Sequence, residues 1–207
     1  MVSKISETTI ETFAIELLEK LGYQYIYGPT IAPDSETPER ESFEDVLLID
    51  RLRKAVGRIN PVVPQDCQED AVKQIQRLIS PELIANNEAF HRLLTEGIKV
   101  TIQKDGRSRG DLVWLVDFKK PENNDFLVVN QFTVIENNVN KRPDVILFVN
   151  GLPLVVIELK NPVDENTTVK SAFKQLQTYK QAIAGLFTFN SIMVASDRLE
   201  AKAGSIS

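Results

Sequence analysis

One stretch of the chain, RPDVILFVNGLPLVVIELKNP at residues 142–162, constrains the fold more than any other. Its middle is apolar and rich in β-branched residues, and an Asn-Gly pair interrupts it, which is typical of two strands joined by a turn. Yet Asp144 lies near its start, and Glu158 and Lys160 lie near its end. Because buried charges are costly unless they are paired or bind a metal, we expect these three side chains to be held together.

The alternation of side chains between the two faces of a strand decides whether these charges meet. A two-residue turn at Asn150-Gly151 would pair residues whose numbers sum to an odd value, and would separate Asp144 from Glu158. A three-residue loop with Gly151 in the left-handed conformation gives an even sum and places both acids on one face. Pro153 cannot donate a ladder hydrogen bond, which argues against the plain tight turn and favours the even register.

Two carboxylates that converge at a sheet edge form a site for a hard divalent cation such as Mg²⁺, which prefers a few carboxylate oxygens and several waters. The cation would offset the repulsion between Asp144 and Glu158, polarise a phosphate and lower the pKa of a bound water. Lys160, on the same face, would orient that water or stabilise charge on the phosphate. This arrangement indicates phosphodiester hydrolysis. The alternative is a structural Glu158–Lys160 ion pair at the end of a strand, because the D-x(13)-E-x-K pattern is short.

The rest of the chain reads as helices followed by strands, and then a helix and a strand. Apolar residues at helical spacing predict helices over about 10–21, 41–59, 65–79 and 86–98, with a Pro-containing loop after the first. Runs of β-branched and aromatic residues predict strands at 99–103, 111–118 and 125–135. A helix over 169–186 and a final strand at 189–197 complete the pattern. We therefore expect one α/β domain with a central mixed β-sheet flanked by helices.

Composition limits the class of protein. The chain has 207 residues, of which 43% are hydrophobic and 26% charged, as is typical of a soluble globular protein. The net charge of −5 does not favour a dedicated nucleic-acid binder, although a local basic patch can exist within an acidic average. The single cysteine, Cys67, excludes an internal disulfide. The chain shows no secretory signal and no apolar run of membrane-spanning length, so we expect a cytoplasmic protein.

The central stretch, with Pro143 ahead of the aspartate, resembles the catalytic hairpin of the PD-(D/E)xK nucleases. More narrowly, it resembles the N-terminal nuclease domain of the restriction subunit of type I restriction-modification enzymes. Near the start, ETFAIELLEKLGYQY is similar to the first helix of that family, and SIMVASD followed by AKAGS is similar to its exit from the domain. QLQTY supplies a Gln-x(3)-Tyr pattern downstream of the lysine. The resemblance covers most of the chain.

The resemblance implies a PD-(D/E)xK restriction-endonuclease-like core and a single nuclease domain over residues 1–207. The helical part would cover about 1–97, and the catalytic sheet and helix about 98–207. It also implies Mg²⁺ as the cofactor. The roles that it implies are metal ligands for Asp144 and Glu158 and the catalytic lysine for Lys160.

Three further residues become candidates through the resemblance. Gln175 and Tyr179 lie four apart on a predicted helix and share a face, so they would contact the DNA backbone or support the active site. Alternatively, they lie at the margin of a helix that packs on the sheet. Glu11, on the first helix, would bring another carboxylate to the metal, or else is a solvated surface acid.

Other polar residues favour simpler interpretations. The basic run at residues 51–58 would contact phosphates, but such a run is more often a solvated helix face. Lys119 and Lys120 are expected in a loop. His91 has no Ser or Cys partner that points to nucleophilic catalysis, and we expect it at the surface or in helix packing.

The chain contains no G-x(4)-G-K-[ST] phosphate loop. Since type I restriction subunits carry an ATP-driven translocase after the nuclease domain, we expect an N-terminal fragment of a longer motor subunit. That subunit would use ATP and act on double-stranded DNA with methylase and specificity subunits. The predicted function is a Mg²⁺-dependent endonuclease domain that cleaves DNA phosphodiester bonds. The alternative is a catalytically silent nuclease-fold module that binds DNA or docks partner subunits.

Overall fold

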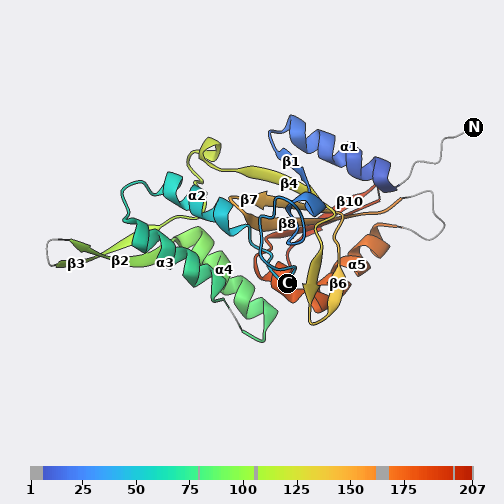
Figure 1. Ribbon diagram of the computed structural model, residues 1–207. Helices are drawn as coiled ribbons and strands as arrows, with labels where there is room; N and C mark the ends of the chain where they lie inside the picture. The colour runs from blue at the N-terminus through green and yellow to red at the C-terminus, as the bar shows by residue number, and fades with distance from the viewer. Residues whose placement is uncertain (1–6, 79, 105–106, 162–167, 198, 207) are drawn as a thin grey trace, which may run out of the picture.

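A six-stranded mixed β-sheet forms the centre of the molecule (Figure 1). The computed structural model describes residues 7–78, 80–104, 107–161, 168–197 and 199–206. In spatial order the strands are β1 (Gln24–Tyr27), β4 (Phe126–Asn130), β7 (Val145–Val149), β8 (Leu152–Leu159), β9 (Ile192–Ser196) and β10 (Ala201–Gly204). β1 pairs parallel with β4 and β8 pairs parallel with β9, while the other neighbours are antiparallel. The predicted mixed sheet is confirmed.

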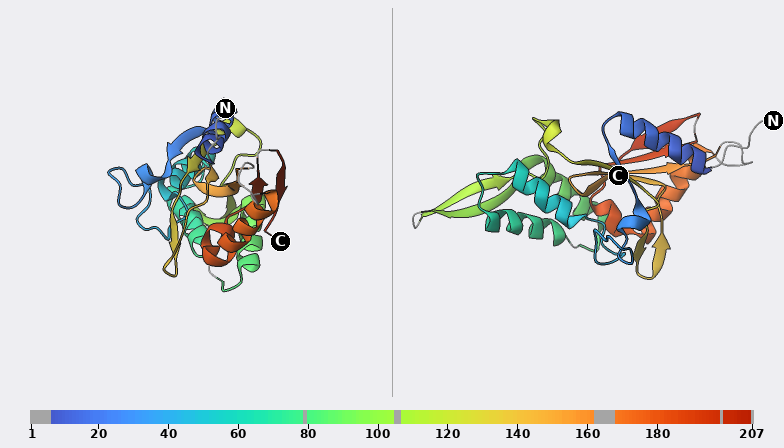
Figure 2. Two further views of the ribbon diagram at one scale, coloured as in Figure 1. Left: turned by 90° about the vertical axis from the view of Figure 1, so that its right-hand side faces the viewer. Right: turned by 45° about the horizontal axis from the view of Figure 1, so that its top comes forward.

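Helices cover both faces of this sheet (Figure 2). On one face lies α1 (Glu7–Lys20), whose Ile10 and Ile15 pack with Val145 and other strand residues. On the other face lie α5 (Val169–Ala182) and α6 (Ala184–Thr188), which belong to the main hydrophobic core. Successive residues of a strand point to opposite faces, so each strand of the β7–β8 hairpin contributes to both layers.

The apolar stripe that predicts α1 is only partly covered. Ile10 is buried, but Phe13, Leu17 and Leu21 have exposed fractions of 61%, 44% and 77%. Ile15, which lies outside the predicted stripe, is buried instead. The sheet therefore contacts α1 along a line that is rotated from the one that the apolar spacing indicates.

Three helices and a hairpin extend the molecule beyond the sheet (Figure 1). The helices are α2 (Ile49–Ile59), α3 (Gln65–Gln76) and α4 (Leu83–Glu96), and the hairpin consists of β2 (Ile98–Lys104) and β3 (Arg107–Val113). A smaller hairpin is formed by β5 (Val134–Glu136) and β6 (Val139–Lys141), and single 3₁₀ turns occur at Gly28–Ile31 (η1) and Pro121–Asn123 (η2). Among the described residues, no helix has the length and apolar content of a membrane span.

The structure corrects two predictions in the first part of the chain. Residues 24–27, which were expected in a loop, form the edge strand β1. Residues 41–48 are not helical, and α2 begins only at Ile49. This segment is irregular, and its side chains Val46 and Leu47 are buried in the core. Tertiary burial thus accounts for an apolar pattern that also fits a helix.

The later strands and helix are shorter than predicted. The strand expected at 111–118 ends at Val113, and the run at 125–135 is two strands separated at Gln131, whose φ of 56° breaks the extended conformation. The helix expected over 169–186 is divided at Ile183 into α5 and α6. The strand expected at 189–197 corresponds to β9, but it is followed by β10 and is therefore not the last.

The turn between β7 and β8 differs from both predicted geometries. Asn150 and Gly151 form a two-residue turn, with φ angles of 54° and 81°, and the first pairs of the ladder sum to an odd number. A β-bulge then leaves Leu154 unpaired in this ladder and shifts the register, so that Val145 pairs with Ile157. The even register is confirmed beyond the bulge, but the predicted three-residue loop is wrong.

Candidate active site

The ends of β7 and β8 bring the predicted acidic residues together. Asp144 directly precedes β7, and Glu158 is the last residue but one of β8. Since Val145 pairs with Ile157, the register places Asp144 opposite Glu158. Val156, two residues before Glu158, belongs to the core beneath α5, so both acids lie on the strand face that α5 covers. The register agrees with the predicted convergence on one face.

Hydrogen bonds fix both carboxylates at this strand end. Asp144 Oδ2 accepts a hydrogen bond from the Leu159 N–H at 2.7 Å. Glu158 Oε1 forms an ion pair with Lys160 Nζ at 2.6 Å, and the two side chains are 2% and 19% exposed. The Glu158–Lys160 ion pair that the sequence left open as an alternative therefore exists, but it lies beside a second carboxylate.

The two acids repel each other. Burial, and then the nearby Glu158 carboxylate, raise the pKa of Asp144 to about 7. The Leu159 N–H and the Lys160 charge lower this pKa, but they offset the shift only in part. Because like charges held close together disfavour ionisation, a bound cation would relieve the repulsion. The chemistry of the carboxylates thus fits a hard divalent ion.

A metal site here would have few protein ligands. In the part of the chain that the structure describes, no group of three or more His, Cys, Asp or Glu side chains is arranged to hold a metal ion. Mg²⁺ commonly binds through one or two carboxylates and retains several waters, so Asp144 and Glu158 suffice in number. The assignment of these two residues as magnesium ligands remains a prediction.

Helix α5 places Tyr179 near the same carboxylates. Tyr179 is buried, and its hydroxyl donates to the Arg142 carbonyl at 3.4 Å. Burial, and then the charge of Glu158, raise the pKa of Tyr179 far above its usual range, whereas a hydrogen bond with Gln175 lowers it in part. Gln175 and Tyr179 therefore share a helix face that lies toward the acidic pair. Their role in DNA contact or active-site support remains a prediction.

Glu11 approaches this strand end from α1. Its Oε2 accepts hydrogen bonds from Gln131 Nε2 at 3.0 Å and from Asn130 Nδ2 at 3.4 Å. Its charge adds to the raised pKa of Asp144, as the weakest of the causes. Glu11 is thus buried and hydrogen-bonded rather than a solvated surface acid. Its assignment as a metal ligand is untested.

Gln131 is a further residue of this site, and the sequence pattern does not single it out. Its N–H donates to the Asp144 carbonyl at 3.3 Å, while its side chain holds Glu11. Its φ of 56° is a left-handed conformation that costs a non-glycine residue about 1–2 kcal/mol. The polar pair Asn130-Gln131 at the end of an apolar strand is the only sequence signal, and it is equally typical of an ordinary loop.

The basic run on α2 makes contacts within the chain, and the predicted solvated helix face fits its exposed members but not Arg51, whose side chain is 18% exposed. Lys54 is exposed. The partners of the three arginines are Glu39 and Asp125 for Arg51, Asp50 and Glu69 for Arg53, and the Asn123 carbonyl for Arg58.

The other polar candidates also have structural surroundings. The backbone N–H groups of Lys119 and Lys120 donate to Asp117 Oδ1 in an exposed loop. His91 Nε2 lies 3.0 Å from the Asn190 carbonyl oxygen, and the His91 ring packs against Phe90. These contacts confirm a loop position for the lysines and helix packing for the histidine.

Comparisons with known proteins agree with the resemblance. The family model described as type I restriction enzyme R protein N terminus matches residues 4–207. The chain is 37% identical, over 204 residues, to the type I restriction enzyme HindI endonuclease subunit of Haemophilus influenzae, covering 98% of this chain and 19% of that protein. It is 35% identical, over 207 residues, to the putative type I restriction enzyme MjaIXP endonuclease subunit of Methanocaldococcus jannaschii, covering 98% and 20%. The chain thus spans about a fifth of the length of these curated relatives. It belongs to the family of type I restriction enzyme R protein N-terminal regions.

Proposed function

We propose that this chain is a Mg²⁺-dependent endonuclease domain that cleaves phosphodiester bonds of double-stranded DNA. The observation that carries the proposal is the position of Asp144 opposite Glu158, with Lys160 paired to Glu158, at one strand end. The raised pKa of Asp144 supports it, because buried carboxylates with perturbed pKa values are more frequent at functional sites than elsewhere. The α/β architecture with this hairpin is what a PD-(D/E)xK core requires.

The proposed roles follow from the contacts. Asp144 and Glu158 would hold the magnesium ion, which supplies Lewis-acid polarisation of a phosphate and lowers the pKa of a bound water. The Lys160 ammonium lies beside the buried acids and its side chain is partly exposed, so it would stabilise charge on a phosphate bound there. Tyr179 and Gln175 would position the carboxylates from α5. Glu11, held by Gln131, would contribute to the charge of the site.

We further propose that the chain acts as part of a longer endonuclease subunit. The relatives named above are type I restriction enzyme endonuclease subunits, and they are about five times as long. An ATP-driven translocase would lie in the remainder of such a subunit. Methylase and specificity subunits would be its partners on DNA. Sequence recognition and ATP hydrolysis would therefore depend on parts outside this chain.

The test is plasmid nicking by the complete enzyme with Lys160→Ala or Lys160→Arg. We expect both variants to lose about 100-fold or more in cleavage rate, as is usual when one charge-stabilising group is removed. ATP hydrolysis should be unchanged. Lys120→Ala, a substitution in an exposed loop, should cleave normally.

Two variants are needed because Lys160→Ala leaves the buried Glu158 without its ion-pair partner, and breaking a buried pair is strongly destabilising. Lys160→Arg keeps a positive charge near Glu158, so we expect it to keep the melting temperature while cleavage is lost. Normal cleavage by both variants would overturn the catalytic assignment.

A silent module that binds DNA or docks partner subunits is the second candidate. The ion pair between Glu158 and Lys160 favours it, because the lysine neutralises one carboxylate without any metal. A titration of the chain with Mg²⁺ and Mn²⁺ separates the two functions. Saturable binding that Asp144→Asn abolishes supports the nuclease, whereas no binding supports the silent module.

A further inference from the structure

The hairpin of β2 and β3 is the element that the candidate active site leaves without a function. It forms a sheet of its own and projects from the end of the molecule that lies opposite α1 and α5 (Figures 1 and 2). Its base is anchored, because Ile98 and Val113 are fully buried in the main core. Its outer half lacks this cover, since Thr101, Gln103 and residues 107–110 are exposed.

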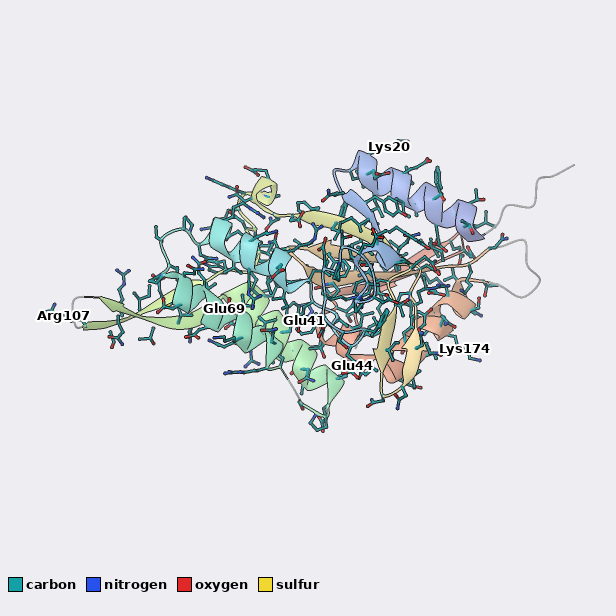
Figure 3. All side chains as sticks on the ribbon, viewed as in Figure 1. Lys20, Glu41, Glu44, Glu69, Arg107 and Lys174 are labelled. Atoms are coloured by element: carbon teal, nitrogen blue, oxygen red, sulfur yellow. The ribbon has the colours of Figure 1, made fainter. Side chains whose placement is uncertain are left out.

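This hairpin is basic in an acidic chain. Residues 98–113 contain four lysines or arginines and two aspartates, whereas the whole chain has a net charge of −5. Lys99, Arg107 and Arg109 are exposed, and none of them forms an ion pair with any residue that the structure describes. Figure 3 places Arg107 at the far tip. Arg51 and Arg53 of α2, by contrast, are held by acidic side chains.

The alternation of side chains along β3 brings two arginines to one face. Arg107 and Arg109 are two apart on β3 and therefore share a face, and both are exposed. Like charges held near each other repel. An external anion beside the two arginines would offset this repulsion, so this face of the hairpin is suited to binding a polyanion.

A DNA duplex is the polyanion that matches this shape. The major groove of B-DNA admits a two-stranded β-ribbon, and the guanidinium fork of arginine matches phosphate oxygens. With strands of seven residues each, the hairpin extends roughly 20 Å. We propose that its outer half, with Arg107 and Arg109, contacts the phosphate backbone of duplex DNA away from the candidate active site.

This inference rests on the proposed function, because it adds a DNA contact to the same enzyme. Its consequence is that a duplex touching both the hairpin and the acidic site would lie along the length of the molecule (Figure 1). Such a contact would hold DNA without taking part in the chemistry. Substitutions in the hairpin should therefore weaken DNA binding and spare the cleavage rate at saturating DNA.

The experiment measures binding of a duplex of arbitrary sequence by the complete endonuclease subunit at several salt concentrations, without divalent metal. The variant is Arg107→Gln with Arg109→Gln. We expect its affinity at low salt to fall by roughly tenfold, and the slope of log affinity against log salt to become shallower by about 2, since each lost phosphate contact contributes about 0.9.

Two control variants make the result specific. Arg77→Gln with Arg92→Gln removes two exposed arginines from outside the hairpin and should bind like the unchanged protein. Arg107→Lys with Arg109→Lys keeps both charges and should keep most of the salt slope. Should the glutamine variant have a lowered melting temperature, binding is measured well below that temperature, where the loss of affinity and the shallower slope are still expected and their absence overturns the contact.

The outcomes separate this inference from the proposed function. An unchanged affinity and slope in the glutamine variant would overturn the hairpin contact, even if Lys160→Arg abolishes cleavage. If instead DNA binding falls while no Mg²⁺-dependent cleavage is found in any variant, the hairpin contact stands and the nuclease assignment fails. Loss of assembly with partner subunits at unchanged DNA affinity would show that the hairpin binds protein, and would overturn the DNA assignment.

Discussion

Asp144 is a carboxylic acid whose pKa lies far from its ordinary value. Its pKa of about 7 in the folded chain lies above the ordinary value of 3.8, because of burial and then repulsion by Glu158. The folded chain thus keeps a proton that the unfolded chain has already lost above pH 4. The stability that this proton contributes is fully present below the unfolded pKa and is lost as the pH rises through about 7.

We therefore expect Asp144→Asn to raise the melting temperature at about pH 8 in the absence of metal, by a few degrees. The amide carries no charge, so the repulsion with Glu158 disappears. The advantage over the unchanged chain should shrink toward about pH 5, where Asp144 itself is protonated. Adding Mg²⁺ at about pH 8 should stabilise the unchanged chain and leave the variant unaffected. A variant that is less stable at about pH 8 without metal would contradict the repulsion.

Asp117 supplies the control of opposite sign. Its carboxylate accepts hydrogen bonds from the Asn123 side chain and from the N–H groups of Lys120 and Lys119, which hold its pKa below the ordinary value. This stability is present above the unfolded pKa and is lost as the pH falls through the folded one. Asp117→Asn should therefore lower the melting temperature at about pH 8, and the loss should shrink in acid.

At the scale of elements, alternation and composition predict most of what the structure contains. The strands of the β7–β8 hairpin and the helix with Gln175 and Tyr179 follow from local patterns. The bulge at Leu154 does not, because every residue from Leu152 to Ile157 is apolar, so a shift of register by one residue leaves no mark in the hydrophobic pattern. The strand β1 is equally hidden, since its four residues become a strand only by pairing with β4, about a hundred residues later.

The candidate site also contains residues that the sequence predicts and one that it does not. Their spacing predicts that Asp144, Glu158 and Lys160 lie together on one strand face, and the register agrees with this. Gln131 is not found, because its place depends on a backbone turn at the end of β4 and on contacts with α1. Packing between distant segments determines such positions, and a local sequence pattern does not predict it.

The turn that joins β7 and β8 offers a test of how tightly this element is held. Gly151 has a φ of 81°, and a Cβ there would lie 2.4 Å from the Leu48 carbonyl oxygen. The same turn binds α2, because the Leu48 N–H donates to the Gly151 carbonyl at 3.0 Å. We expect Gly151→Ala to lower the free energy of unfolding by more than about 2 kcal/mol, from the left-handed φ together with the clash.

Gly22→Ala separates the two causes. Gly22 also has a positive φ, 98°, but nothing lies within 4 Å of a Cβ built there. Gly22→Ala should therefore lower the free energy of unfolding only by the cost of a left-handed φ, about 1 kcal/mol. Urea titration of both variants measures the difference. Equal losses would mean that the turn and the start of α2 move apart without cost, and that the contact at Leu48 does not hold the hairpin in place.

For the whole molecule, the question is whether the helical end and the sheet fold together. One cluster of buried side chains runs through both, from Leu52, Ile75 and Phe90 on the helices to Phe148 and Val156 on the sheet. A continuous core of this kind leaves no plane along which one part could unfold while the other keeps its buried surface. The single-domain organisation remains a prediction, and thermal unfolding tests it.

We expect one cooperative transition for the 207-residue chain. Trp114, the only tryptophan, directly follows the anchored end of β3, so its fluorescence reports on the helical end, while far-UV circular dichroism reports on all elements. Both signals should change at the same temperature. Phe90→Leu, in a fully buried position of α4, should lower both by the same amount, roughly 2–6 °C for a loss of about 1–2 kcal/mol. An earlier transition in the Trp114 signal alone would mean that the helical end and its basic hairpin unfold as a separate unit.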